Sequence, residues 1–550
     1  MSEIYKLKII LLGANDRGAL ALAKEFKRRD FHVIVADWQD MSVKYSCNID
    51  QYIILPNIEE SASQFVQELI LTIKENKVKY IFPINDAGLE VCDKFLKELS
   101  EISTIVGYTN SQYLYSHNKN ALLEIAKYIG VKTPKSILIK SINQFNEILE
   151  TEKLDFPLVC KPINSKLIKD DRLYSFNVKI VNNSKELTNF IRENINNVNI
   201  MLQEYIEGKG IGFNFFSING LIKKNYAHER ITEPLNGGQS SYRKTIPIDT
   251  YNIQDTSLKI IEKIEWNGIG MLEYKLHKGE LYLMELNGRI WGSVMLGNYA
   301  GINIPSSFID YYFFAKKISA NSNYKIRYVR NLKLDLKYLI EKYKKERNVF
   351  ELFKWLLSLT RSFLPIEKIE DNPIKNIRVE IPSWIDYVKR FLFNKSLQKK
   401  ISKKDIKRKP IIKNNQKIAF VCTGNICRSP FAELYAKKHF NNFVFNSFGL
   451  IFQANRLSSV NAEIAAKEFD INICTHQSRI LTKEEIENQD IIFIMDKYHY
   501  YTLSNKFPEY LSKIFFLDNK EIIDPYGNDS EFYKKTYSQI ASAINNIISK

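Results

Sequence analysis

The sequence lacks the features of a secreted or membrane-spanning protein. Its 6 cysteines among 550 residues are too scattered for a disulfide framework or a paired CxxC metal site. We expect the isolated Cys47, Cys92, Cys160 and Cys474 to be small buried apolar residues. No apolar run approaches the roughly 20 residues that span a bilayer, and the start, "MSEIYKLKIILLG", has no signal-peptide pattern. These absences predict a cytoplasmic protein.

Positive charge is in excess, and it is confined to one region. The chain has a net charge of +17. Residues 321–417 contain 26 Lys and Arg against 10 Asp and Glu, a net of +16, and the run 395–417 holds ten basic residues and one acid. This segment is either a solvated linker or a surface that binds anionic lipid at the inner membrane face through its basic residues with Trp355 and Trp384. It matches no nucleic-acid-binding module.

Strand and helix patterns divide the chain into four segments. Residues 1–110 alternate apolar strands with amphipathic helices, which is typical of a parallel sheet covered on both faces. Residues 111–315 mix helices with longer strands, including a hairpin, "MLEYKLHKGELYLMELN", that turns at "HKGE". Residues 316–415 read as a basic helical region and linker, and residues 416–550 return to strand–helix alternation. The predicted class is α/β.

The stretch "VCTGNICRSP" carries the most specific chemistry. Cys422 and Arg428 have C-x5-R spacing, so the loop can curl its backbone N–H groups around one phosphoryl group while Arg428 holds two of its oxygens. Gly424 and Asn425 suit positive-φ positions, and a helix that starts at Ser429 directs its N-terminus at the same point. This environment favours the thiolate form of Cys422, which can attack phosphorus.

A later stretch, "EIIDPYGND", supplies a proton donor. Asp524 lies in a turn that contains a proline. A carboxyl group placed there can protonate the leaving oxygen and then accept a proton from water. The two stretches together predict hydrolysis of a phosphomonoester through a cysteinyl phosphate, without a cofactor.

These motifs, with "SFG", "DINICTHQSRIL" and "DIIFIMD", closely resemble the low-molecular-weight protein tyrosine phosphatase family over about 135 residues. The resemblance implies a four-stranded parallel sheet flanked by helices, with Cys422 as nucleophile and Asp524 as acid. It also implies that Ser429 hydrogen-bonds the thiolate and that Asn425 holds the shape of the loop. Cys427 would trap an oxidised Cys422 as a disulfide. The family usually has "SAG" where this chain has "SFG".

The residue before the second cysteine of the loop indicates the substrate. By resemblance, protein-arginine phosphatases carry Thr there, whereas Ile426 fits the tyrosine-type branch and Tyr526 could stack on an aryl substrate. The expected substrate is a phosphotyrosine protein or a small phosphomonoester. Phosphatases of this family often accompany capsule and exopolysaccharide synthesis, so the resemblance favours a role in cell-surface polysaccharide or precursor metabolism.

The hairpin brings oxygen ligands together. Glu285 and Asn287 lie two residues apart on one strand, so they project from the same face, and Glu273 on the preceding strand can face the same point. Two carboxylates and an amide oxygen form a hard site suited to Mg²⁺ that bridges ATP phosphates. The alternative is that they lie on the wet face of an edge hairpin.

Residues 1–315 resemble the ATP-grasp superfamily, in particular its carbamoyl-phosphate-synthase-like branch of carboxylate–amine ligases. The resemblance implies a Rossmann-like pre-domain, 1–110, and an ATP-grasp domain of two α+β lobes, 111–315. Lys119 and Lys161 would reach the nucleotide phosphates. The triphosphate loop would lie in "HERITEPLNGGQSSYRK".

Three further positions follow from the same resemblance. In "LQEYIEG", the backbone from Glu204 to Ile206 would pair with adenine while Tyr205 packs. Arg289 would hold the acyl phosphate or the substrate carboxylate. The family more often has Pro where this chain has Gly288, and the expected ribose-contacting acid is not evident after the hinge.

The implied ligase reaction has two steps. A carboxylate takes the γ-phosphoryl group of ATP, giving an acyl phosphate, and an amine then displaces phosphate to form an amide; the enzyme positions the groups and neutralises charge. ATP and Mg²⁺ are implied for this half, while the carboxylate and the amine stay unnamed. A second hypothesis is that this half binds ATP without turnover and regulates the phosphatase.

Overall fold

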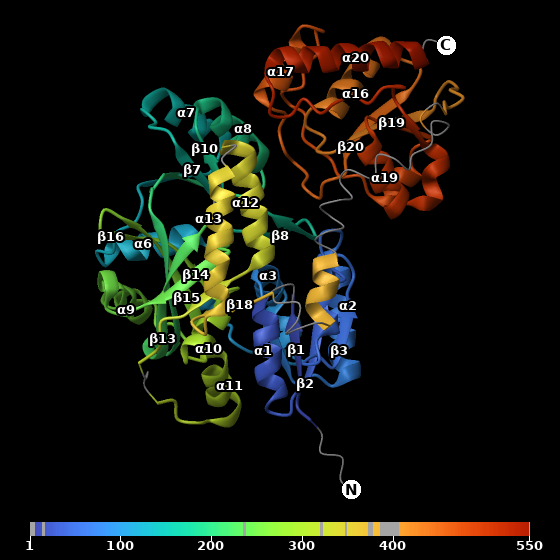
Figure 1. Cartoon of the computed structure of the whole chain (residues 1–550). Coiled ribbons are helices and arrows are strands. Elements are labelled where there is room, and N and C mark those ends of the chain that lie inside the picture. Colours follow the sequence, from blue (N-terminus) through green and yellow to red (C-terminus); the bar gives the residue numbers. More distant parts are fainter. Residues whose placement is uncertain are drawn as a thin grey trace. The chain divides into compact units, whose positions relative to one another are not determined.

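A computed structural model describes residues 6–13, 17–234, 238–319, 323–346, 349–371, 378–385, 406 and 408–548 (Figure 1). The chain forms two compact units. The first contains residues 1–137, 163–180 and 201–387, and the second contains residues 138–162, 181–200 and 388–550. Among the described helices, none combines the length and the apolar character needed to cross a bilayer.

A five-stranded parallel sheet begins the first unit, as the alternating pattern predicts. Its spatial order is β3 (Gln51–Ile54), β2 (His32–Asp37), β1 (Lys8–Leu12), β4 (Tyr80–Pro83) and β5 (Thr104–Ile105). Successive residues of β1 face opposite sides, so Ile9 and Leu11 pack with helix α1 (Arg17–Lys27), while Ile10 and Leu12 pack with α2 (Ala62–Asn76). Figure 1 shows α1 and α2 on opposite sides of this sheet.

A seven-stranded sheet forms the largest layer of the first unit. Its order is β16 (Glu280–Asn287), β15 (Gly268–His277), β12 (Lys209–Ile218), β13 (Leu221–Thr232), β14 (Tyr242–Ile246), β17 (Tyr328–Arg330) and β18 (Glu367–Ile369). All neighbours are antiparallel except β17 and β18. His277 pairs with Glu280, so the predicted hairpin turn is present.

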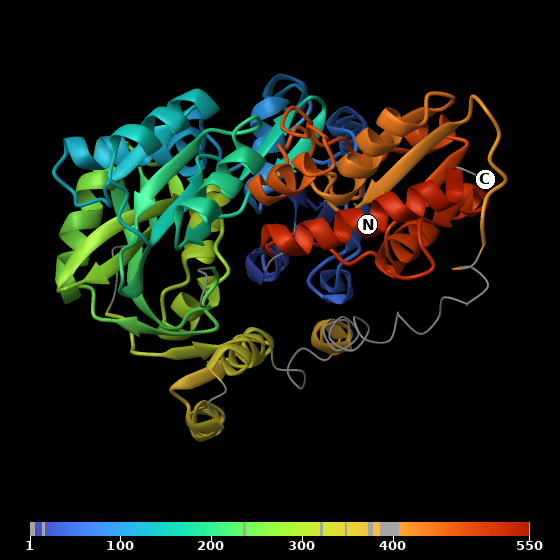
Figure 2. The same ribbon diagram turned by 90° about the horizontal axis from the view of Figure 1, so that it is seen from above.

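This sheet extends beyond residue 315, into the segment expected to be a basic linker. The buried Arg330 on β17 is 2.5 Å from an oxygen of Asp335 and 3.1 Å from one of Glu367. Asp335 lies on α12 (Leu332–Glu346), which packs beside α13 (Val349–Leu359) (Figures 1 and 2). The buried ion pairs attach these helices to the sheet, so this part of the segment is folded structure. About half of the most basic run, 395–417, falls outside the described residues, which omit 386–405 and 407.

The remaining elements of the first three hundred residues complete the list. A four-stranded sheet has the order β10 (Lys179–Val181), β7 (Leu158–Pro162), β11 (Ile200–Glu204) and β6 (Ser136–Ile139), and β8 (Lys166–Lys169) pairs with β9 (Arg172–Ser175). The other helices are α3 (Asp86–Lys94), α4 (Leu96–Ser100), α5 (Asn110–His117), α6 (Lys119–Tyr128), α7 (Ile142–Thr151), α8 (Ser184–Asn194), α9 (Ile253–Lys263), α10 (Val294–Ala300) and α11 (Ile304–Phe314).

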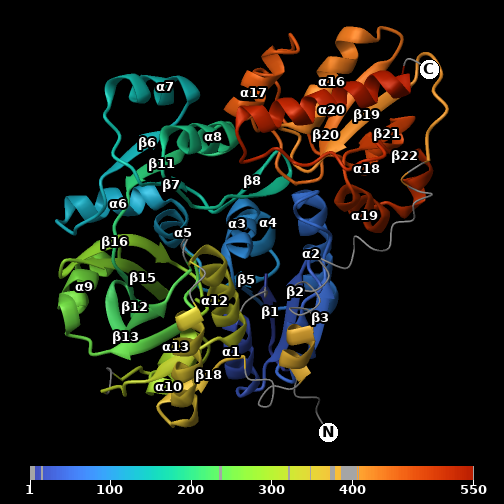
Figure 3. The ribbon, with the colours of Figure 1, turned by 45° about the horizontal axis from the view of Figure 1, so that its top comes forward.

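A second parallel sheet lies in the last 134 residues, 417–550. Its order is β20 (Val444–Gly449), β19 (Lys417–Cys422), β21 (Ile491–Ile494) and β22 (Ile514–Phe516), and every pairing is parallel. One face packs on α16 (Arg428–His439) and α20 (Ser530–Ile548), and the other on α18 (Lys483–Glu487) and α19 (Lys497–Lys506) (Figure 3). Helix α17 (Val460–Lys467) packs against α20.

The four isolated cysteines differ in burial. Cys92 and Cys160 are buried, as predicted, but Cys47 and Cys474 are exposed. The prediction is wrong for the second pair because both residues lie in surface turns between elements, where no sheet or helix face covers them.

Candidate active sites

The loop after β19 curls around the Cys422 sulfur. Cys422 ends the central strand of the sheet, and α16 begins at Arg428. The Asn425 backbone N–H donates to Cys422 Sγ at 3.3 Å, and Ser429 Oγ lies 3.0 Å from the same sulfur. The structure thus places Ser429 where the resemblance predicts it.

Arg428 is buried beside this loop, and most of its donors are already bonded. Its Nη1 donates to Asp496 Oδ2 and to the Ile522 carbonyl, both at 2.8 Å, and its Nη2 is 2.9 Å from Asp524 Oδ2. Its Nε has no partner among the described residues. Nε and Nη2 form the edge of a guanidinium that can bind two oxygens of one phosphoryl group. Although burial opposes the charge, Cys422, Asp524 and Asp496 raise the pKa of Arg428.

Asp524 reaches Arg428 from the proline-containing turn, as the sequence predicts. Its side chain is 45% exposed, so the carboxyl group has access both to water and to the cradle. A phosphoryl group that accepts from Arg428 Nη2 competes with Asp524 for that donor. Asp524 would then be released towards the leaving oxygen.

Sequence reasoning missed the groups that hold Arg428. Asp496 follows the apolar strand β21, and its other oxygen accepts from the His499 backbone N–H at 3.0 Å, which caps α19. His499 Nε2 lies 3.0 Å from Thr423 Oγ1 in the loop itself. Burial, and then the charge of Arg428, lowers the pKa of His499 well below its ordinary range. An acidic residue directly after a buried strand beside β19 was the available signal.

Asn425 fixes the back of the loop, in agreement with the resemblance. Its φ is +51°, a left-handed conformation. Its side-chain amide donates to Ser429 Oγ and Ser447 Oγ, both at 2.9 Å, and its Oδ1 accepts from the Arg479 backbone N–H at 2.7 Å. Ser447 in turn donates to the buried carboxylate of Glu433 at 2.5 Å. This network was not predicted, because its members lie on four separate segments.

Gly424 has a different reason for being glycine from the one predicted. It does not adopt a positive φ. An added Cβ would lie 2.7 Å from Nη2 of Arg456, so a larger residue here would displace the end of that side chain. The role predicted for a positive φ belongs to Asn425 alone.

Cys427 is buried and poorly suited to rapid ionisation. Its sulfur lies 3.4 Å from the hydroxyl of Tyr533. Burial raises the pKa of the Cys427 thiol to about 12. A thiol held in its protonated form attacks an oxidised sulfur slowly. The disulfide with Cys422 therefore stays a prediction.

The hairpin in the first unit gathers the three predicted metal ligands. Glu273 on β15 pairs directly with Glu285 on β16, and the amide of Asn287 donates to Glu273 Oε1 at 3.0 Å. Arg230 on β13, which sequence reasoning missed, forms an ion pair with the other Glu273 oxygen. Burial raises the pKa of Glu273; Arg230 lowers it and Glu285 raises it. A site with two adjacent carboxylates fits a divalent cation, which would reduce their mutual repulsion.

Arg289 lies beside a carboxylate that sequence reasoning also missed. Its Nε is 2.9 Å from Asp86 Oδ1 at the start of α3. Although burial opposes ionisation, Arg289, His117 and Lys119 lower the pKa of Asp86. Lys119 is buried and its Nζ donates to Ser165 Oγ at 2.8 Å. Charged groups from helices α3, α5 and α6 and from the end of β16 therefore converge in the first unit.

The predicted hinge leaves its tyrosine open. Tyr205 is 43% exposed, so the described residues cover its side chain only in part. The Glu204 backbone N–H donates to the Lys135 carbonyl at 3.0 Å, so that group is not available to adenine, while Ile206 follows in extended chain. Lys161 is buried on β7, in the second unit. Gly288 is explained by packing, because an added Cβ would lie 2.6 Å from Ser116 Cβ.

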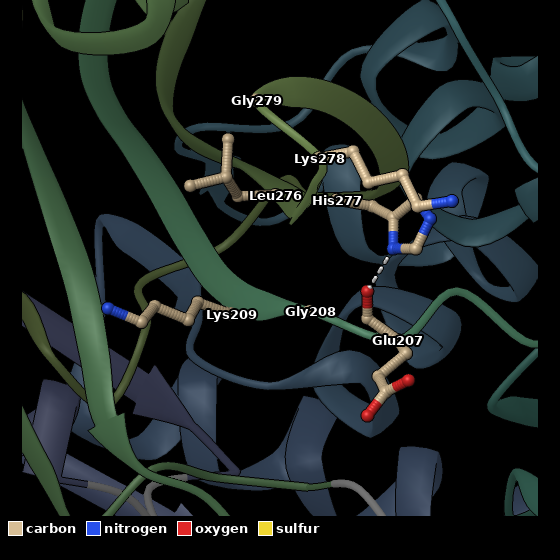
Figure 4. A pocket seen from close by; sticks show the side chains of 7 residues that line it. All are labelled: Glu207, Gly208, Lys209, Leu276, His277, Lys278 and Gly279. Atoms are coloured by element: carbon tan, nitrogen blue, oxygen red, sulfur yellow. Dashed lines mark hydrogen bonds between the residues drawn. The ribbon is translucent and has the colours of Figure 1, made fainter.

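A pocket of about 510 Å³ lies next to this hinge (Figure 4). It is lined by residues 207–209 and by the hairpin turn 276–279. The ring nitrogen Nδ1 of His277 is 2.6 Å from the carbonyl oxygen of Glu207, as the dashed line marks. None of the residues predicted to hold nucleotide or metal lines this pocket, so it supports no function here.

The loop places a cysteine sulfur beside a backbone N–H, a hydroxyl, a buried arginine and an exposed carboxyl group, which is the arrangement of a cysteine-based phosphatase. Residues 417–550 match the family described as "Low molecular weight phosphotyrosine protein phosphatase". They are 35% identical over 137 residues to the low molecular weight protein-tyrosine-phosphatase PtpB of Staphylococcus aureus, covering 94% of it and 23% of this chain. Through these residues the chain belongs to the low molecular weight phosphotyrosine protein phosphatase family.

Two further comparisons concern the substrate of the phosphatase and the N-terminal part of the chain. The chain is 32% identical over 133 residues to a protein-arginine-phosphatase of Bacillus subtilis, covering 88% of that protein and 22% of this chain. Its N-terminal part resembles ATP-grasp ligases in structure, among them an L-amino acid ligase from Bacillus licheniformis. That match covers 56% of this chain and 74% of the ligase, with 18% identity and a TM-score of 0.43. The predicted α/β class and the phosphatase family are confirmed, whereas a match at this level assigns neither a family nor a reaction to the N-terminal part.

Proposed function

We propose that residues 417–550 hydrolyse phosphotyrosine through a cysteinyl phosphate. The observation that carries the proposal is the cradle: the Asn425 N–H donates to Cys422 Sγ, Arg428 Nε has no partner among the described residues, and Arg428 Nη2 contacts Asp524 Oδ2 and Thr423 Oγ1. The Cys422 thiolate attacks phosphorus, Arg428 holds two phosphoryl oxygens, and Asp524 protonates the leaving oxygen. Asp524 then accepts a proton from the water that cleaves the S–P bond.

The choice of phosphotyrosine rests on Ile426. This residue is buried within the loop, so its side chain shapes the cradle wall. Because relatives include both tyrosine and arginine phosphatases, the decisive experiment compares phosphotyrosine and phosphoarginine peptides of the same sequence. We expect the wild type to prefer phosphotyrosine and Ile426→Thr to reduce that preference. A wild-type preference for phosphoarginine would overturn the substrate assignment while leaving the cysteine chemistry in place.

We also propose that the N-terminal part joins a carboxylate to an amine at the expense of ATP. What supports this is the cluster of Glu273, Glu285 and Asn287, together with Arg289 beside Asp86. Mg²⁺ bound by the three oxygen ligands would neutralise charge on the ATP phosphates. Lys119 and Lys161 are proposed to bind those phosphates, and the hinge around Tyr205 to bind adenine. Arg289 is proposed to orient the substrate carboxylate.

ADP release tests this proposal. Purified full-length Cys422→Ser protein, which preserves phosphorylated products, is given ATP, Mg²⁺ and pools of carboxylates and amines. The ligase proposal predicts ADP release only when both substrates are present. Nucleotide binding without turnover in any pool would favour the second candidate, an ATP-binding module that regulates the phosphatase. That candidate is favoured by the Arg230–Glu273 ion pair, which already supplies one positive charge to the metal site.

We further propose that α13 holds the chain against an anionic membrane surface. Phe350, Phe353, Leu356 and Leu357 recur at helical spacing and are each more than half exposed, within a region of strong positive charge. Trp355 is unavailable for this role, because its indole N–H donates to Asp335 at 2.8 Å.

Vesicle sedimentation tests the membrane proposal. Vesicles with and without anionic lipid are mixed with the full chain at low and high salt. We expect pelleting only with anionic vesicles at low salt, and less of it for Phe353→Ser. Leu71→Ser, at an equally exposed leucine on α2, is the matched control. Equal pelleting of both variants would contradict the role of α13.

A further inference from the structure

Arg456 is a buried arginine beside the phosphate cradle that the proposed reaction does not use. It lies in the connection between β20 and α17, and only 6% of it is exposed. Its Nη2 donates to the carbonyl oxygen of Gly424 at 2.6 Å. A second guanidinium is therefore built against the loop that also leads to Arg428.

The backbone around Arg456 is held by a neighbouring segment. The Arg456 N–H donates to Ser478 Oγ at 3.0 Å, and its carbonyl accepts from the Ser478 N–H at 2.9 Å. Asn455 adopts a φ of +61° and donates to the Ser478 carbonyl at 2.8 Å. These bonds fix the direction in which the Arg456 side chain leaves the backbone.

The guanidinium of Arg456 has capacity for another partner. Its Nε is buried with no hydrogen-bond partner in the described part of the chain, and the ion pairs found there do not include it. An arginine stays charged even when buried, and a buried charge is costly without a counter-charge. A neutral carbonyl oxygen does not supply one. We therefore expect Arg456 to meet a negatively charged group that does not belong to the described residues of the chain.

Tyr526, in the turn that carries Asp524, lies within electrostatic range of Arg456. Burial and the carboxylate of Glu193, which accepts from the Tyr526 hydroxyl at 2.6 Å, raise the pKa of Tyr526 well above its ordinary value, and the positive charge of Arg456 acts in the opposite direction. Tyr526 follows two residues after the proposed acid Asp524. Arg456 therefore lies near both the cradle, through Gly424, and the turn that carries Asp524.

We propose that Arg456 binds a carboxylate of the substrate, so that the phosphatase selects phosphotyrosine flanked by acidic residues. The proposal rests on the phosphatase function proposed above and adds the class of substrate. The carboxylate is distinct from the phosphoryl group for a geometric reason. Arg456 donates to the carbonyl oxygen of Gly424. The phosphoryl group, in contrast, is proposed to bind the loop N–H groups and the Nε–Nη2 edge of Arg428.

A matched pair of peptides tests this. Both carry one phosphotyrosine; one has Glu on each side of it and the other has Gln. The wild type is expected to hydrolyse the Glu peptide with a kcat/KM about tenfold higher. Arg456→Met should abolish the preference, and the ratio of the two kcat/KM values is the readout because loss of the bond to Gly424 would change the rate on both peptides and on p-nitrophenyl phosphate by a common factor. Arg456→Lys, which keeps the charge with fewer donors, should show an intermediate preference.

Two controls separate specific recognition from general effects. Lys483→Met removes an exposed positive charge on α18, away from the cradle, and should keep the preference. Binding of both peptides to Cys422→Ser repeats the comparison without turnover. Equal affinity for the two peptides, or an Arg456→Met variant that loses the same factor on both peptides and on p-nitrophenyl phosphate, would overturn the proposal and leave Arg456 as a support for the loop. A wild type inactive on p-nitrophenyl phosphate that still binds the Glu peptide more tightly would contradict the proposed function, not the role of Arg456.

Discussion

The two candidate sites differ in how the chain assembles them. The phosphate cradle is made by consecutive residues between a strand and a helix, so its geometry follows from local backbone structure. The proposed magnesium cluster is made by residues of β15 and β16 beside Arg230 of β13, so it exists only when these strands of the seven-stranded sheet are paired. We expect the geometry of the contiguous site to be less sensitive to mutations in distant elements. The dispersed site depends on the register of its strands.

The largest effect is expected at the cradle. Cys422→Ser removes the nucleophile, so p-nitrophenyl phosphate hydrolysis should fall by at least about 10⁴-fold. Substrate-dependent ADP release should be unchanged, because the magnesium cluster lies in the other unit. A parallel loss of both activities would show that the two sites do not act independently.

The arginine fork ranks next. Arg428→Lys keeps the charge but removes the Nε–Nη2 edge, so kcat/KM should fall by roughly 10³-fold. The measurement is initial-rate kinetics on p-nitrophenyl phosphate, with Arg408→Lys in the connection before β19 as the matched substitution. A loss below about tenfold would mean that positive charge alone, rather than the fork, stabilises the transition state.

A substitution in the Glu273, Glu285 and Asn287 cluster should reduce activity less than one in the phosphate cradle. Glu273→Gln removes one oxygen ligand and the partner of Arg230, so ADP release should fall by about 100-fold and require more Mg²⁺. Glu280→Gln, at the exposed hairpin turn of the same strand pair, is the control. If both variants lost ADP release equally, hairpin integrity rather than metal binding would be the explanation.

The smallest effect concerns pH and stability. The pKa of His499 is lowered in the folded state, so below its ordinary value of 6.5 the unfolded chain binds a proton that the folded chain does not. The free energy of unfolding should therefore fall as pH drops below 6.5, by up to about 1.4 kcal/mol per pH unit from this residue. His499→Gln should show a shallower fall in denaturant titrations at pH 7 and pH 5.5. Identical slopes would contradict a neutral buried His499.

The sequence predicts what is local in this molecule. The alternation of strands and helices predicts the first parallel sheet and the C-x5-R spacing predicts a loop for one phosphoryl group, while the family resemblance implies the second parallel sheet and the roles of Ser429 and Asn425. The period of two along a strand predicts that Glu285 and Asn287 share a face, and the structure adds Glu273 directly opposite.

What the sequence does not predict depends on contacts between distant segments. Asp86 meets Arg289 across 203 positions, and Arg230 meets Glu273 across 43. Neither pairing has a local pattern, because each requires strand order and helix placement to be known first. The same holds for β17 and β18, whose three-residue lengths are too short for a periodic signal.

The central claim, that Cys422 carries the phosphoryl group during turnover, has a direct test. Asp524→Asn should slow hydrolysis of the intermediate more than its formation from p-nitrophenyl phosphate, because that leaving group needs little protonation. Rapid quenching followed by peptide mass spectrometry should then find one phosphoryl group on the peptide that contains Cys422. A phosphoryl group on any other residue, or full turnover by Cys422→Ser, would contradict the account.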